Sequence, residues 1–356
     1  MGRKSILFLS ENRPVPSRET GRLAYLDAGG AGLAINRAMR AALKAITALN
    51  PDVAKSYKAE RKVELLMARL RGKPADYQMW DRKITCGDHH VPVRIFQPCG
   101  GGPFPLLLFF HGGGWVTGGI ENYTGVCADL AKATGHVVAS VDYRLAPEFR
   151  FPAAPEDCYA AAKEFFAGRI LPVDPEKITL TGDSAGGNLA AAVSLMARDR
   201  GEFLPRRQIL LYPATFNDHS ESSPFPSVRE NGTEYLLTSK RVESFMKLYS
   251  SSAKDFSNPY FAPLLAGDLS NQPRTLIITA EFCPLRDEGE FYGKKLREAG
   301  NDVEIYRMKG ALHAFLMLPP RFIHVKRAYR VINRFLAERT FRHESDQKMG
   351  QAGQCR

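Results

Sequence analysis

The sequence predicts an α/β fold with a mainly parallel, eight-stranded sheet and helices on both of its faces. After Pro74, short runs rich in β-branched and aromatic residues alternate with helical segments, as expected when a crossover helix follows each parallel strand. Hydrophobic residues make up 44% and charged residues 24% of the 356 residues, which favours a folded core over wholesale disorder.

The predicted strands are short apolar runs, at residues 83–86, 91–97, 106–110, 137–143, 178–181, 209–212, 275–280 and 303–308. The first two flank a Gly87-Asp88 turn and are predicted to pair as an antiparallel hairpin at the sheet edge. Helical segments are predicted at residues 124–134, 158–167, 187–198 and 288–298.

Two further regions are predicted to form a helical cap over the end of the sheet. Residues 1–75 read as helical without a convincing strand, and Asn50-Pro51 divides them into two helices. Their basic residues, among them Lys58 and Arg61, are predicted to face solvent. The second region is an insertion at about 215–265, with a helix at 240–249, that is too long for a plain loop. The main domain then spans 76–340, followed by a disordered tail at 341–356.

The charge and apolar patterning exclude several classes of protein. Lys and Arg number 49 against 38 Asp and Glu, a net charge of +11 that is compatible with carboxylate-bearing substrates. The basic residues are scattered and match no nucleic-acid motif, so a solvated basic surface is expected. The longest apolar runs, such as 105–110, are far too short to span a membrane.

The cysteines and the amino-terminal segment predict a reduced, cytoplasmic protein. The six cysteines lie far apart with no CxxC pair, which suggests neither a zinc site nor a disulfide scaffold. Only four apolar residues, at 6–9, follow the basic start, and a secretory signal needs a longer apolar core.

The strongest chemical signal is Gly182-Asp183-Ser184-Ala185-Gly186, between a predicted strand and a predicted helix. This is the G-x-S-x-G pattern of a nucleophile elbow, in which small residues flank a serine on a strained turn. The beginning of a helix also places a positive dipole end beside a developing negative charge. Ser184 is therefore the predicted nucleophile.

Two other motifs complete this chemistry. His111-Gly112-Gly113-Gly114-Trp115 follows the strand at 106–110, and its glycines leave backbone N–H groups free to form an oxyanion hole. His313 lies just past the last strand, 129 residues after Ser184, where the base follows the serine in chain order. The other histidines show no metal-ligand spacing.

Together with Asp142-Tyr143-Arg144-Leu145-Ala146-Pro147-Glu148 and Pro284-Leu285-Arg286-Asp287-Glu288-Gly289, these motifs resemble the hormone-sensitive lipase family of carboxylesterases. The resemblance covers roughly residues 91–336. It implies an α/β-hydrolase fold with a helical cap and ester hydrolysis through an acyl-enzyme. It further implies Ser184 as nucleophile, His313 as base, and N–H groups of Gly113, Gly114 and Ala185 in the oxyanion hole.

One position departs from the family pattern. The aspartate that orients the histidine in that family is replaced here by Cys283, and a neutral thiol cannot stabilise an imidazolium as a buried carboxylate does. Asp287, four residues on, is the preferred replacement, although it could instead cap a helix with Glu290. Glu281 is the second candidate for the residue that orients His313, although it could instead hold a loop in place. The third possibility is that no carboxylate orients the histidine.

The predicted function is hydrolysis of small, short-acyl esters, with a small-molecule ester as partner and no cofactor or metal. The alternatives are a non-catalytic or weakly active binding protein that kept the pocket, or an amide or formamide hydrolase. Four aromatic residues of the insertion are pocket-lining candidates: Phe225, Tyr235, Phe245 and Tyr260. The oligomeric state is left open, with a homodimer as one option.

Overall fold

The computed structural model describes residues 24–26, 40, 43–45, 52–70, 77–100 and 104–337. The predicted tail at 341–356 and most of the first predicted helix lie outside these ranges.

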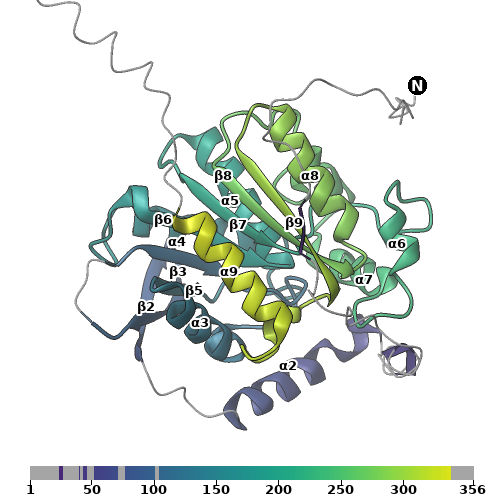
Figure 1. Ribbon diagram of the computed structural model, residues 1–356, viewed down its shortest axis with the longest axis horizontal. Coiled ribbons are helices and arrows are strands. Elements are labelled where there is room, and N and C mark those ends of the chain that lie inside the picture. Colours follow the sequence, from purple (N-terminus) through teal and green to yellow (C-terminus); the bar gives the residue numbers. More distant parts are fainter. Residues whose placement is uncertain are drawn as a thin grey trace, which may run out of the picture.

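The described strands form one nine-stranded sheet in the order β1-β9-β8-β7-β6-β4-β5-β3-β2 (Figure 1). The strands are β1 (Ala24–Leu26), β2 (Tyr77–Cys86), β3 (His89–Pro98), β4 (Leu106–Phe110), β5 (Val137–Val141), β6 (Ile178–Asp183), β7 (Arg207–Leu211), β8 (Arg274–Phe282) and β9 (Val303–Leu312). Neighbours are parallel except β2 with β3 and β3 with β5. All eight predicted strands and the edge hairpin are confirmed.

The ninth strand corrects the expectation that residues 1–75 hold no strand. β1 pairs in parallel with β9, with Ala24 opposite Tyr306. Three residues are too few to show a strand periodicity, so this pairing depends on the free edge of β9 rather than on a local pattern.

Helices cover both faces of the sheet, as predicted. They are α2 (Val53–Leu70), α3 (Ile120–Thr134), α4 (Ala153–Phe166), α5 (Ala185–Arg200), α6 (Pro226–Glu230), α7 (Ser239–Tyr249), α8 (Arg286–Glu298) and α9 (Ile323–Ala337), with short 3₁₀ turns η1 (Pro175–Lys177), η2 (Ala253–Ser257), η3 (Pro263–Leu265) and η4 (Phe315–Met317). α3 packs against α9, which crosses in front of the sheet in Figure 1, and α4 packs against α5. Every residue of β4, β5 and β6 is buried, as parallel strands covered on both faces require.

The carboxyl ends of the parallel strands meet at one edge, and the chemical motifs follow these ends. The glycine run follows β4, Ser184 follows β6, Cys283 follows β8 and His313 follows β9. Residues that lie far apart in the sequence are thereby brought to one place, as is typical of open α/β sheets.

The segment between β7 and β8 holds α6, α7, η2 and η3, and a buried contact between His219 and Glu288 fixes it to the sheet domain. Glu288 of α8 accepts hydrogen bonds from the Thr215 and Phe216 amides (2.6 and 3.2 Å) and contacts His219 Nε2 at 2.6 Å. His219 and Glu288 are both fully buried. Their pairing holds the start of this segment against α8.

Helix α2 lies against α3 and α7. Arg61 was expected to face solvent, but its guanidinium donates to the carbonyl groups of Val116 and Ala146 (2.6 and 2.7 Å) and binds Glu148. Glu60 of the same helix pairs with Arg241 of α7. These contacts join α2 to the loop that follows β4 and to the segment after β7.

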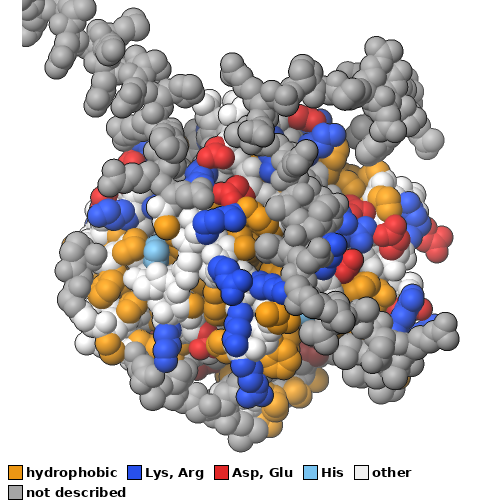
Figure 2. Space-filling model, in the orientation of Figure 1, with side chains coloured by type: hydrophobic (Ala, Val, Ile, Leu, Met, Phe, Trp, Pro, Cys, Tyr) orange, Lys and Arg blue, Asp and Glu red, His pale blue; other side chains and the backbone are white. Residues whose placement is uncertain are grey.

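The face of the molecule that carries α9 has mixed charge (Figure 2). Figure 2 shows basic side chains interspersed with acidic and apolar ones on the face that carries α9. None of the helices described in the structure is both long enough and apolar enough to cross a bilayer.

Candidate active site

Ser184 lies on a strained turn between β6 and α5. Its backbone has φ 55° and ψ −119°, which a non-glycine residue rarely adopts. The chains around it are packed so closely that a Cβ atom on Gly186 would lie 1.9 Å from the Phe110 carbonyl oxygen, and one on Gly182 would lie 2.2 Å from the Gly186 oxygen. The glycines of the motif are therefore required by packing, and the turn presents the Ser184 hydroxyl to the cavity.

His313 follows β9, and its Nε2 lies 2.9 Å from Ser184 Oγ. Its ring is held edge-on to Tyr212, with 5.0 Å between the ring centres. Burial lowers the pKa of His313 to about 3, so the imidazole is neutral at physiological pH. A neutral Nε2 at this distance can accept the serine proton.

Cys283 fills the third position, with Sγ 3.1 Å from Nδ1 of His313. The residue is fully buried, and burial raises the pKa of its thiol far above the ordinary value. The thiol is therefore neutral, and no carboxylate contacts Nδ1 within the described part of the chain. The backbone N–H of Leu285 also bonds to this sulfur.

The structure does not bring Asp287 to His313, so the preferred replacement acid is wrong on geometry. One oxygen of Asp287 accepts from Arg286 Nε (2.7 Å) and the other accepts from the Ser227 amide (2.8 Å). Burial alone would raise the pKa of Asp287, but the bonds and charge of Arg286 outweigh it and leave this pKa below its ordinary value. The carboxylate thus joins α8 to α6.

The expected capping box at Asp287 is also absent, because α8 begins at Arg286 with Leu285 at its N-cap. Glu290 instead binds Arg307 and accepts from the Thr279 hydroxyl. The second option for the acid, Glu281, accepts from the Gly310 amide at 2.6 Å. Glu281 therefore holds the β9 backbone three residues before His313, which is its loop-holding alternative.

The glycine run after β4 borders the same cavity as the serine. Gly113 and Gly114 have φ of 112° and 61°, which side-chain-bearing residues rarely adopt, and both line the cavity with Ala185 at the first position of α5. In the described chain, neither the Gly113 nor the Gly114 amide donates a hydrogen bond within the protein. Their placement agrees with the oxyanion role that the resemblance implies.

Asp183 links the serine turn to this glycine run, and the sequence analysis did not identify it. Its fully buried carboxyl accepts from the Gly112 amide (2.8 Å) and from the Tyr123 hydroxyl (3.0 Å). Burial raises the pKa of Asp183 to about 7, although these hydrogen bonds oppose the increase. Its position next to Ser184 in the motif was the available signal.

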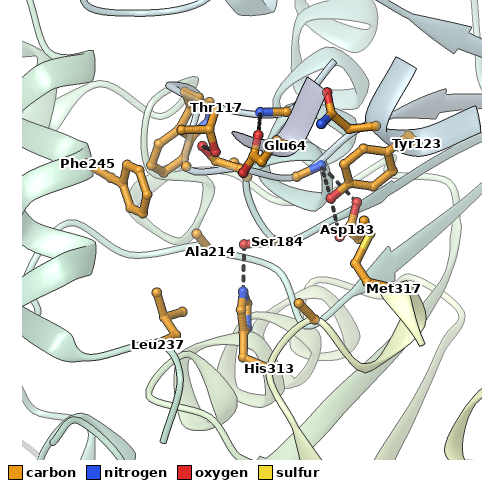
Figure 3. A pocket seen from close by; sticks show the side chains of 18 of the residues that line it. Glu64, Thr117, Tyr123, Asp183, Ser184, Ala214, Leu237, Phe245, His313 and Met317 are labelled. Atoms are coloured by element: carbon orange, nitrogen blue, oxygen red, sulfur yellow. Dashed lines mark hydrogen bonds between the residues drawn. The ribbon is translucent and has the colours of Figure 1, made fainter. Parts of the chain in front are cut away.

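The cavity measures about 380 Å³, and Figure 3 shows Ser184 and His313 facing into it. Its walls are largely apolar and include Val63, Met67, Leu237, Val242, Phe245 and Met317. Glu64, Thr117 and Asn122 add polar groups. Four residues of α2 contribute to the lining, and no sequence motif marks them individually.

Of the four aromatic candidates, Phe245 lines the cavity, and its ring lies where a side chain on Gly114 would be. The other three pack elsewhere: Phe225 against Phe216 and Phe291, Tyr235 against Phe282, and Tyr260 with its hydroxyl donating to Asp199.

No three His, Cys, Asp or Glu side chains of the described ranges are grouped as they would be around a metal ion.

Comparison with known proteins agrees with this geometry. Residues 107–317 match the family model for the α/β hydrolase fold. The arylesterase of Saccharolobus solfataricus is 39% identical over 262 residues, 73% of this chain and 84% of that protein. The ethyl acetate hydrolase of Pseudomonas putida is 34% identical over 267 residues, 73% of this chain and 83% of that protein.

Among solved structures, the hyperthermophilic esterase of the archaeon Pyrobaculum calidifontis matches with a TM-score of 0.76 and 39% sequence identity, over 85% of this chain and 97% of that one. The family match covers more than half of the chain and includes both Ser184 and His313. The chain therefore belongs to the α/β-hydrolase family, among the carboxylesterases that resemble hormone-sensitive lipase.

Proposed function

We propose that this chain is a serine carboxylesterase that hydrolyses small esters through an acyl-enzyme on Ser184. The observation that carries the proposal is the 2.9 Å contact between Ser184 Oγ and His313 Nε2, inside a cavity bordered by Gly113, Gly114 and Ala185. The relatives named arylesterase and ethyl acetate hydrolase support ester chemistry on small substrates.

The reaction proceeds in two steps, acylation of Ser184 and hydrolysis of the acyl-enzyme. In the first, His313 Nε2 takes the proton from Ser184 Oγ as Oγ bonds to the carbonyl carbon, and the N–H groups of Gly113, Gly114 and Ala185 stabilise the oxyanion. The C–O bond then breaks, and the alcohol leaves with the proton from Nε2. In the second step, water gives a proton to Nε2 and attacks the acyl carbon, and Ser184 regains its proton as the acid departs.

Cys283 makes this machinery weaker than one that has an aspartate. Nε2 can accept the serine proton only when the imidazole proton is on Nδ1. A carboxylate accepts hydrogen bonds only and therefore holds that proton on Nδ1, whereas a thiol can also donate to Nδ1 and favour the unproductive tautomer. The neutral thiol also leaves the imidazolium without a charge partner. We therefore expect slow turnover.

The cap consists of α2 and the segment at about 215–265, placed over the main domain at 76–340. Support comes from Val63 and Met67 of α2, and from Leu237 and Phe245 of the segment, which line the cavity beside Ser184. With these side chains closing it, a volume of about 380 Å³ favours short acyl groups. Cytoplasmic location and a homodimer stay predictions, the second of which sedimentation would test.

The second candidate function is small-molecule binding without turnover, and the neutral thiol at position 283 is the observation that favours it. A fluorophosphonate probe and p-nitrophenyl acetate separate the two functions. An esterase labels at Ser184 and releases p-nitrophenol, and Ser184→Ala loses both signals. Wild-type protein that binds the ester but neither labels nor turns it over is a binding protein. A matched p-nitroacetanilide assay distinguishes ester from amide hydrolysis.

A further inference from the structure

Glu64 of α2 places a carboxylate in the wall of the cavity that holds Ser184. One of its oxygens accepts from the Gly118 amide at 3.1 Å, and the Thr117 hydroxyl, which donates to the Gly113 carbonyl at 3.3 Å, lies beside the carboxyl. In Figure 3, Glu64 and Thr117 lie on one side of Ser184, and His313 lies on the other. A carboxylate has about four acceptor sites, so these two contacts leave capacity for a ligand.

The charges around Glu64 do not neutralise it. The charged groups that act on it are Glu60 and Arg241, and these two form an ion pair with each other. The Arg241 guanidinium also lies over the Phe245 ring, 5.0 Å from its centre. Burial raises the pKa of Glu64, while the hydrogen bond from Gly118 and the Thr117 hydroxyl beside the carboxyl oppose the increase. At pH 8 the group adds a negative charge to a cavity whose walls are largely apolar.

The geometry points to Glu64 as a specificity-determining residue that selects esters with a hydrogen-bond donor, preferably a cationic nitrogen, and discriminates against carboxylates. This inference rests on the proposed function, because it assigns the substrate class of the same site. A cationic group that reaches Glu64 forms a charge-assisted hydrogen bond in a partly dehydrated setting, whereas an anionic group there is repelled.

This selectivity is opposite to the one expected from net charge. The +11 balance of the chain is compatible with carboxylate-bearing substrates, but it is distributed over a surface that water and salt screen. A charge in the cavity wall acts at contact distance with little screening. The local carboxylate therefore decides the preference of bound substrates.

The test uses two series of esters that differ in charge, assayed at pH 8 with the full chain. The acyl series is methyl 6-aminohexanoate, methyl hexanoate and monomethyl adipate, followed by methanol release. The alcohol series is 3-(dimethylamino)propyl acetate, whose protonated nitrogen carries an N–H donor, and its neutral isostere 4-methylpentyl acetate, followed by acetate release. The variants are Glu64→Gln, which retains an acceptor for the Gly118 amide, and Glu243→Gln as the matched control. Glu243 is on α7, pairs with Lys247 and does not line the cavity.

In the wild type, we expect kcat/KM to favour the cationic over the neutral ester by about tenfold in at least one series, as one hydrogen bond to a charged group provides. Glu64→Gln should remove this preference and raise the rate of monomethyl adipate relative to methyl hexanoate. Glu243→Gln should retain the wild-type ratios. A purely structural role of Glu64 would change all esters by one common factor.

Three results overturn the inference, and they differ in what else they overturn. Wild-type protein without a cationic preference in either series, or Glu64→Gln with wild-type ratios, removes the role of Glu64 and leaves the esterase intact. The wild-type ratios do not depend on whether any variant folds. Failure of wild-type protein to hydrolyse any of these esters overturns the proposed function, and this inference with it.

Discussion

Replacing the thiol at position 283 with a carboxylate is expected to raise turnover by about 10²- to 10³-fold. Cys283→Asp would place an acceptor beside His313 Nδ1, where Sγ now lies at 3.1 Å. The Leu285 N–H that bonds to the sulfur would supply a second donor to the new carboxylate. The carboxylate would hold the imidazole proton on Nδ1 and stabilise the imidazolium that forms during the reaction.

The magnitude follows from the contact and its burial. Two unit charges about 4 Å apart attract by about 4 kcal/mol at an effective dielectric constant of about 20. Burying the carboxylate at a fully buried position consumes part of this gain. A net gain of about 3–4 kcal/mol corresponds to about 10²- to 10³-fold, since about 1.4 kcal/mol changes a rate tenfold. The loss of about 10⁴ that follows removal of this charge in a serine protease sets the upper bound.

The assay is kcat for p-nitrophenyl acetate, with active sites counted by fluorophosphonate titration. Cys283→Asn is the matched variant without a charge: its amide can donate to Nδ1 as the thiol can, so little or no gain is expected. Cys283→Ser should give no gain, because a hydroxyl group, like the thiol, is neutral and can both donate and accept a hydrogen bond. A Cys283→Asp protein with wild-type circular dichroism, full labelling and kcat within twofold of wild type would refute the reasoning.

Three other predictions concern the same site. The pH profile of kcat/KM should differ between the wild type and Cys283→Asp. Burial holds the pKa of His313 at about 3 in the wild type, and a neighbouring carboxylate would raise this pKa, so activity of the variant should fall at a higher pH on the acid side. Acid limbs that coincide in the two proteins would contradict this. Asp183→Asn should raise the melting temperature at pH 8 but not at pH 4. Folding raises the pKa of Asp183 from about 3.9 to about 7, so between these pH values the native state binds more protons than the unfolded state, and it loses up to about 4 kcal/mol of stability as the pH rises through this range. Equal changes in melting temperature at pH 4 and pH 8, measured by calorimetry, would exclude this cause. Gly186→Ala should abolish labelling of Ser184, because the methyl group would meet the Phe110 carbonyl oxygen at 1.9 Å, whereas Gly125→Ala on α3, with no atom near its Cβ position, should retain labelling.

The contact between Ser184 and His313 could be predicted from the sequence because its signals are local. The G-x-S-x-G motif combines small residues with a strand before it and a helix after it, and the same short range of chain determines the turn that Ser184 adopts. His313 was identified from its place after the last strand, since the carboxyl ends of parallel strands lie together whatever the connecting helices do. The replacement of the acid by Cys283 is likewise evident from the motif alone.

The partner of His313 and the polarity of the cavity could not be predicted in this way. Asp287 is four residues from Cys283, but α8 begins at Arg286 and turns that carboxylate toward Ser227, sixty residues away along the chain. Glu64 comes from α2, whose periodic pattern predicts a helix but not which cavity its side chains enter.

The sequence by itself therefore determined the positions of eight strands along the chain, the proposed nucleophile and base, and the cysteine at the acid position, because hydrophobic periodicity and turn sterics act over a few residues. Tertiary structure alone decided which carboxylates reach the site, because a side chain's neighbours depend on how separate elements pack. Asp183, Glu64 and Asp287 are all acidic, and only the packing of distant elements joins Asp183 to the Gly112 amide, brings Glu64 to the cavity wall and holds Asp287 at the Ser227 amide.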